Sequence, residues 1–288
     1  MNAAFGGVSA ALAWGGADFI ARFTGGALGH VRALFGMLVA SALVLTGATL
    51  ARDGTLAGAG AHWWLLLLSG AGLTAATALL YQGLVRGPVT VVAPIAGTFP
   101  AFNIVLALLL GLRPTPLEWV AMAAVMAGVF VVARSARHFE TGGRYTRSEL
   151  RATVLLALGA SFGFAVTVAA GQEAAVHYGE LRAVCLARWV SLACCVLLLA
   201  VRREVPRIAP RWWPALGAQG ILDGGALLAI VAASQGAASA VTAVLASTFS
   251  AVTVVLARLV LRESMSVSQW VGIGVILAGV ATLSGLQA

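Results

Sequence analysis

Two carboxylates, Asp18 and Asp223, stand inside long apolar stretches of this 288-residue chain. A charged side chain at the middle of a bilayer costs about 2.5–3.5 kcal/mol on insertion scales, so such residues mark candidate functional sites. Asp223 is followed by two glycines. It either lines a cavity that binds an ammonium group or a proton, or makes a structural hydrogen bond to nearby backbone. Asp18 lies four residues before Arg22 on one helical face, which favours an ion pair with a structural or a gating role.

Aromatic and neutral polar side chains form a second set of candidates. Aromatic faces suit planar apolar substrates and ammonium groups through stacking and cation–π attraction, although a single Phe in a membrane helix more often packs or faces lipid. Trp14 and Tyr81 carry polar groups away from the membrane interfaces, and Asn103 lies four residues after Phe99, where it could bind a carboxylate or an amide. We predict substrate contacts for Trp14, Tyr81, Gln82, Phe99, Asn103, Phe162, Phe164 and Thr248.

The stretches that carry these residues have the length and composition of membrane spans. The chain is 60% hydrophobic and 10% charged, whereas soluble domains carry about 25% charged residues. A spanning helix needs about 20 apolar residues. Ten stretches fit, at residues 3–22, 30–50, 62–84, 88–111, 116–134, 152–172, 181–201, 212–234, 237–261 and 267–286. We therefore predict an all-α integral membrane protein with ten transmembrane helices.

The second half of the chain repeats the first about 150 residues on. Residues 93–101 (APIAGTFPA) match residues 243–251 (AVLASTFSA), and a Trp followed by Ala-Gly-Val closes each half. We predict a five-helix repeat at 1–134, a basic linker at 135–151 and a second five-helix repeat at 152–288. Because each repeat holds an odd number of helices, the two copies would be inverted around a central cavity, which is the basis of alternating access.

The positive charge of the chain indicates membrane topology. All 18 basic residues are Arg, the net charge is +8, and most of the Arg residues lie in short loops after the odd-numbered spans or in the central linker. By the positive-inside rule the linker is cytoplasmic and both termini are outside, in an inner (plasma) membrane. The same pattern gives no reason to expect a nucleic-acid partner.

Several kinds of chemistry have no signature in this sequence. A phosphate-cradling Gly-Lys-Ser motif and a Gly-x-Ser-x-Gly elbow are both absent. The four His residues lie at span ends or in loops, and the three Cys residues fall in one apolar run, as small packing residues do. We therefore predict no catalytic residues, no metal site and no cofactor, and we expect the protein not to be an enzyme.

The order of several weak motifs resembles the drug/metabolite transporter superfamily, in the branch of paired EamA-type domains. These are Trp14-Gly15, an Arg opening the second helix of each half (Arg32 and Arg188), Gly87-Pro88 followed by Pro94 and Pro100, and Leu261-Arg262-Glu263. Two positions depart from the family pattern: Leu112-Arg113 replaces an acidic residue, and Ser250 stands where a proline would, which puts a helix break in the second half in doubt. Family members often have cytoplasmic termini, opposite to the Arg count.

The resemblance implies a secondary transporter that exports small amphipathic metabolites, first of all amino acids, including aromatic ones. The bacterial aromatic amino acid exporters look like the closest named group. The alternatives are a proton-coupled exporter of cationic drugs or other metabolites, and a passive channel. The expected partners are a small-molecule substrate and the lipid bilayer, with the chain acting as a monomer or homodimer.

Overall fold

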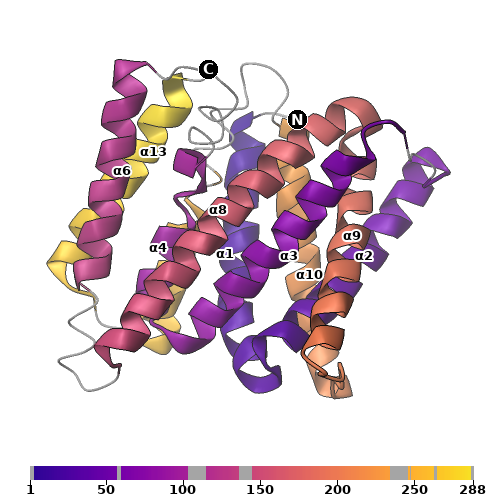
Figure 1. The fold of residues 1–288 in the computed structure, drawn as a ribbon, viewed down its shortest axis with the longest axis horizontal. Helices are drawn as coiled ribbons and strands as arrows, with labels where there is room; N and C mark the ends of the chain where they lie inside the picture. The colour runs from indigo at the N-terminus through magenta and orange to yellow at the C-terminus, as the bar shows by residue number, and fades with distance from the viewer. Residues whose placement is uncertain are drawn as a thin grey trace.

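The computed structural model describes residues 3–56, 60–102, 115–135, 145–233, 246, 248–262 and 265–286. Regular structure within these residues is entirely helical (Figure 1). The first half contains α1 (Ala3–Leu28), α2 (His30–Asp53), α3 (Trp63–Arg86), α4 (Val89–Ala96) and α6 (Pro116–Ser135). The second half contains α8 (Arg147–Tyr178), α9 (Glu180–Val201), η1 (Pro210–Trp212), α10 (Trp213–Ala233), α12 (Phe249–Leu256), the π-helical turn η3 (Ala257–Leu261) and α13 (Val267–Leu286).

These helices confirm the predicted all-α fold with five helices in each half. Each predicted span contains one of them, and α1 continues past residue 22 to Leu28. Five elements are both long and apolar enough to cross a membrane: α2, α3, α8, α9 and α10 together with η1. Residues 103–111 and 237–245 of the predicted fourth and ninth spans lie outside the described residues.

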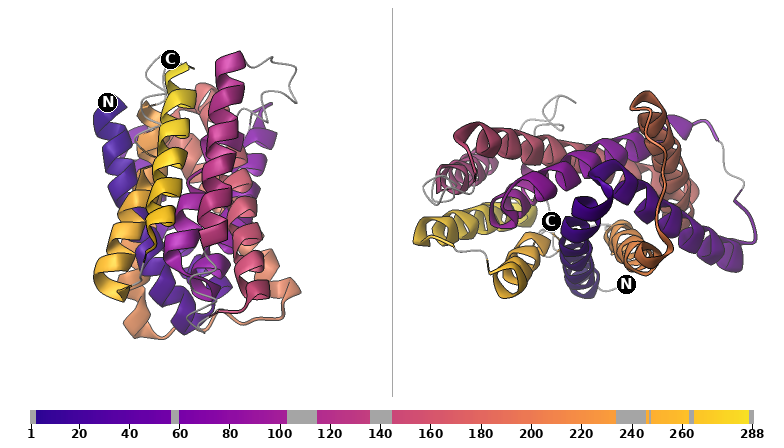
Figure 2. Two further views of the ribbon diagram at one scale, coloured as in Figure 1. Left: turned by 90° about the vertical axis from the view of Figure 1, so that its left-hand side faces the viewer. Right: turned by 90° about the horizontal axis from the view of Figure 1, so that it is seen from below.

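The two halves are inverted copies that pack against each other. In Figure 1, α1 runs down from the N-terminus whereas α8, the first helix of the second half, runs up. The start of α1 and the end of α13 lie at the same end of the molecule (Figure 2). Helix contacts follow a pseudo-two-fold pattern, because α3 packs on α8 and α9 as α10 packs on α1 and α2. The pairs α2–α9, α4–α12 and α6–α13 join equivalent helices of the two halves.

Matching glycines let these helices approach closely. A Cβ at Gly70 of α3 would lie 2.5 Å from the carbonyl oxygen of Ala187, and one at Gly220 of α10 would lie 2.6 Å from that of Met37. The two glycines are 150 residues apart, and so are the two carbonyls. Both contacts therefore need glycine because of space, which is the usual reason for small residues between membrane helices.

The fourth helix of each half is broken at the same position. After α4, the Thr98 hydroxyl donates to the Ile95 carbonyl oxygen at 2.7 Å, and Pro100 has no N–H to continue the ladder. In the second half α12 begins at Phe249, directly after a turn at Thr248. The break is therefore present without a proline. The Thr98 carbonyl accepts from Ala101 N and the Thr248 carbonyl from Ala251 N, both at 2.9 Å, so a tight turn follows the break in each half. The Thr248 carbonyl also accepts the helical bond from Val252 N at 3.3 Å.

Candidate functional site

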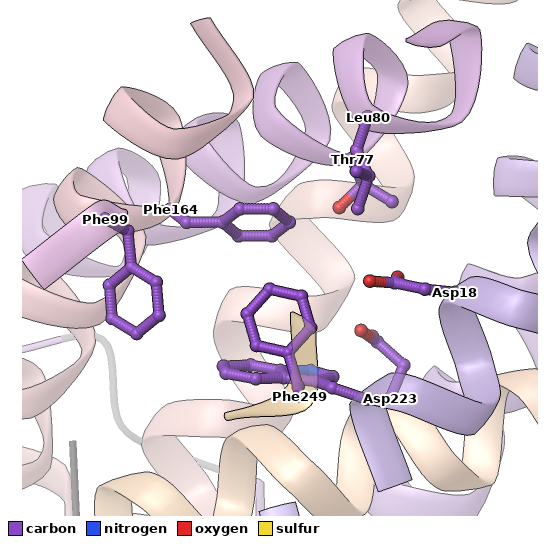
Figure 3. Close-up of a pocket in the computed structure, with 8 residues that line it drawn as sticks. Asp18, Thr77, Leu80, Phe99, Phe164, Asp223 and Phe249 are labelled. Atoms are coloured by element: carbon purple, nitrogen blue, oxygen red, sulfur yellow. The ribbon is translucent and has the colours of Figure 1, made fainter. Parts of the chain in front are cut away.

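A small cavity lies between the two halves. In the first half, its wall comes from α1, α3 and the residues that follow α4. In the second half, it comes from α8, α10 and α12. The lining residues are Trp14, Asp18, Thr77, Leu80, Phe99, Phe164, Asp223 and Phe249 (Figure 3). Inversion of the repeats thus builds one shared site in the interior.

Trp14 and three phenylalanine rings around it form an aromatic cage. The ring centroid of Trp14 lies 5.7 Å from that of Phe249, 6.3 Å from Phe164 and 6.4 Å from Phe99, with the first and third pairs edge-on. Trp14 and Phe164 occupy equivalent repeat positions, 150 residues apart, and so do Phe99 and Phe249. The cage is therefore the pseudo-symmetric part of the site.

The opposite wall is acidic. Asp18 of α1 and Asp223 of α10 are each 7% exposed. Their carboxylates point into the same space, across the cavity from Phe99 and Phe164 (Figure 3), and interact electrostatically. Asp223 Oδ2 accepts from Nη1 of Arg188 at 2.5 Å. For the Asp18 carboxylate, the described residues supply neither an ion pair nor a hydrogen-bond donor.

The structure corrects the predicted position of Arg188. Sequence analysis placed it at the opening of the seventh helix, on or toward the side opposite the basic loops. It is instead the ninth residue of α9 and 0% exposed. The counterpart of Arg32 is Arg182, because each is the third residue of a helix that follows a glycine with positive φ (Gly29 and Gly179).

The predicted ion pair between Asp18 and Arg22 is wrong. The Arg22 guanidinium instead donates to the carbonyl oxygens of Leu84 and, at 2.6 Å, Val85 of α3. The last carbonyl groups of a helix such as α3 have no hydrogen-bond donor within the helix. A guanidinium has five N–H donors and can therefore satisfy two of them at once. Asp18 is thereby left facing the cavity.

A polar chain closes one end of the cavity. Thr24 of α1 donates to the side-chain oxygen of Gln219 at 3.0 Å, and the Gln219 amide donates to the hydroxyl of Tyr81. All three side chains are buried. They lie along α1, α3 and α10 beyond the lining residues, on the side where α1 and α3 end. These contacts tie both halves together on that side.

The remaining predicted residues lie elsewhere. Phe162 is 43% exposed and packs edge-on against Phe102, at 5.8 Å between centroids. Gln82 is half-buried and can accept from Arg86 at 3.1 Å. Thr248 is half-buried in the turn before α12, and Asn103 lies outside the described residues. The structure thus brings Trp14, Phe99, Phe164, Asp18 and Asp223 together on the wall, with Tyr81 behind it.

Sequence reasoning missed Thr77, Leu80, Phe249 and Arg188. Phe249 had a signal, because it is the repeat counterpart of Phe99. Arg188 had no such signal in the repeat, because its counterpart in the first half is Leu38, just as the counterpart of Asp223 is Leu73. The counterpart of Asp18 is Val168, so the acidic wall breaks a symmetry that the aromatic cage keeps.

This architecture, two inverted helical repeats enclosing one site between them, defines a class of membrane transport proteins. The chain matches the EamA-like transporter family twice, over residues 1–134 and 151–285. It therefore belongs to the EamA-like transporter family, within the drug/metabolite transporter superfamily, and is a multi-pass membrane protein.

Solved structures agree with the fold. One crystal structure superposes with a TM-score of 0.68 at 19% sequence identity, covering 97% of this chain and 95% of the other. At that identity the likeness concerns the fold alone. No curated sequence matches the chain. Among the described residues, no group of three or more His, Cys, Asp or Glu side chains is arranged to hold a metal ion.

Proposed function

We propose that this protein is a secondary transporter that exports small amphipathic metabolites carrying a charged nitrogen, with amino acids, aromatic ones included, as the first class. The observation that carries the proposal is the cavity between the inverted repeats. It combines four aromatic rings with a buried carboxylate, Asp18, that has no partner among the described residues.

The two sides of the cavity suit the two ends of such a molecule. An apolar or planar substituent would pack against the faces and edges of Trp14, Phe99, Phe164 and Phe249. An ammonium group would lie toward Asp18. Contacts with the carboxylate and with nearby aromatic faces would there replace its hydrogen bonds to water. The remaining predicted contacts, Tyr81, Gln82, Asn103, Phe162 and Thr248, would act from behind the wall or in another conformation.

Alternating access fits the way in which the wall is divided. Each half contributes three helical segments to the cavity, so a relative tilt of the halves would open one end and close the other. The contacts among Thr24, Gln219 and Tyr81 would have to break when the cavity opens on their side. In our proposal this side is cytoplasmic, as the Arg distribution predicts, and the protein lies in the inner (plasma) membrane.

The test is transport by purified protein in liposomes. Efflux of radiolabelled aromatic, aliphatic and charged amino acids is followed with no gradient other than that of the substrate. We expect saturable movement of aromatic amino acids, with half-saturation shifted to a higher concentration in Asp18→Asn. Glu173→Gln is the matched control, because Glu173 is a carboxylate whose side chain is 61% exposed on α8, away from the cavity. Silence across the panel would refute the amino acid assignment.

A second candidate is the export of cationic drugs or other organic amines, coupled to protons. The unpaired Asp18 carboxylate favours it, because a buried acid can bind either a proton or an organic cation. The same liposomes answer this question with labelled amines and an opposing pH gradient. Acceleration of amine efflux by inward protons, absent in Asp18→Asn, would support it.

A further inference from the structure

We propose that the site selects its substrate as a monovalent cation and discriminates against a zwitterion with the same side chain. This inference rests on the proposed function, since it concerns the substrate class of the same cavity. It starts from the number of charges that surround the cavity and from which of them the cavity wall exposes.

Three ionisable side chains determine the charge balance of the site: Asp18, Asp223 and Arg188. Asp223 is neutralised by Arg188 at 2.5 Å. Asp18 interacts electrostatically with Asp223 and with the Tyr81 hydroxyl, and Arg22, one turn further along α1, is occupied by the carbonyls of α3. With both acids ionised, the site therefore carries a formal charge of minus one.

An ammonium group brings this charge to zero. The interior of a membrane protein has a low effective dielectric constant, so an uncompensated charge there is costly and a compensating one is strongly attracted. The aromatic cage adds to the preference, because ring faces attract cations. A monovalent amine thus satisfies both walls of the cavity at once.

A substrate carboxylate finds no equivalent partner. Among the described residues, the cavity wall includes two carboxylates and no cationic side chain, because Arg188, the ion-pair partner of Asp223, is 0% exposed and does not line the cavity. Like charges repel strongly in an environment of low dielectric constant. A zwitterion would carry its carboxylate into this field, and we expect it to bind at least about tenfold more weakly than the matching amine.

The break in symmetry supports selection by Asp18 rather than by the scaffold. Val168 occupies the equivalent position in the second half, so the cavity has one cation-binding wall. The opposite wall is lined by Phe164. The substrate would therefore bind in a single orientation, with its nitrogen toward α1 and α10.

The experiment measures competition in the liposome assay with probes that share a phenylethyl skeleton. Phenethylamine and its N-trimethyl derivative are cations, L-phenylalanine is a zwitterion and 3-phenylpropionate is an anion. We expect half-saturation for both cations at least about tenfold below that for L-phenylalanine, with no transport of the anion. Protein-free liposomes correct for leakage of the amine, and the trimethyl derivative cannot lose its charge.

Variants of Asp18 assign the preference. Asp18→Asn brings the formal charge to zero and should erase the preference for cations, whereas Asp18→Glu should keep it, and Glu173→Gln should match the native protein. Equal half-saturation for L-phenylalanine and phenethylamine would overturn this inference, while the proposed transport function would stand. A cation preference that persists in folded Asp18→Asn would also overturn it. If none of the probes moves, the proposed function itself fails.

Discussion

The buried ion pair between Arg188 and Asp223 makes a quantitative prediction about stability. The pair is surrounded by protein, with Arg188 0% exposed, and it joins α9 to α10. Removing one partner of a buried pair typically costs about 3–5 kcal/mol because the other charge is left uncompensated. Asp223→Leu should be the worse single change, since a guanidinium cannot be deprotonated in a protein, whereas a carboxyl can take up a proton. The cost of Arg188→Leu should therefore shrink at lower pH.

The double variant Arg188→Leu/Asp223→Leu should behave differently. Its two leucines reproduce the pair Leu38 and Leu73, which the first half carries at the equivalent positions. The scaffold therefore accommodates leucine in this setting, and replacing a buried ion pair by apolar residues of similar volume is often neutral or stabilising. We expect the double variant to unfold with a free energy within about 1 kcal/mol of that of the native protein.

The assay is unfolding by SDS titration in mixed micelles, which gives a free energy for each of the four proteins. The coupling energy from the double-mutant cycle should then approach the sum of the costs of the two single changes. A double variant as unstable as the two single variants would refute the reasoning. That result would mean that leucines cannot pack here and that the pseudo-symmetry of the two halves does not extend to this contact.

Three further predictions concern the cavity and its surroundings. Trp14→Ala should lower the ratio of maximal transport rate to half-saturation concentration at least about tenfold, because Trp14 packs against three other rings. Phe162→Ala should change the same ratio less than about twofold, because Phe162 lies outside the cavity wall and is 43% exposed. Gln219→Leu removes the hydrogen bonds to Thr24 and Tyr81 that close one end of the cavity. Labelling of a cysteine in the cavity wall by a reagent added on that side should become faster. An unchanged labelling rate would contradict a gating role for these contacts. Gly220→Ala should lower thermal stability in detergent, since its Cβ would lie 2.6 Å from a carbonyl oxygen, whereas Gly217→Ala, with open space around it, should not.

The helices could be predicted from sequence because the bilayer thickness sets the length of the apolar stretches, and short polar loops separate them. The aromatic cage was also largely accessible. Trp14, Phe99 and Phe164 were predicted, and Phe249 follows once the repeat is applied to Phe99. Helical geometry could even have separated Phe164 from Phe162, because residues two apart point about 200° away from each other.

Asp18 and Asp223 were predicted as site residues, but the partner of each charge could not be predicted, for a physical reason. Arg188 and Asp223 are 35 residues apart and lie on different helices, so their pairing depends on how α9 and α10 pack. Asp18 and Arg22 showed the opposite error. Their spacing of four residues suited an ion pair, but the carbonyl ends of α3 compete for the same guanidinium and bind it. Local spacing indicates which contacts are possible, and tertiary packing decides among them.

The contrast between a symmetric cage and an asymmetric acidic wall bears on how such a carrier can work. If both halves carried equal charges, a substrate could bind in two orientations related by the pseudo-two-fold axis, and each would need its own exit. Aromatic rings at equivalent positions keep the cavity similar in shape when the halves exchange roles between inward-open and outward-open states. In the proposed transport cycle, the acid at residue 18, opposed by valine at residue 168, would set the orientation of the substrate in both states. Introducing the second acid, Val168→Asp, should therefore weaken transport of a monovalent amine even in a well-folded protein, because the cavity would then hold one negative charge more than its substrate can compensate.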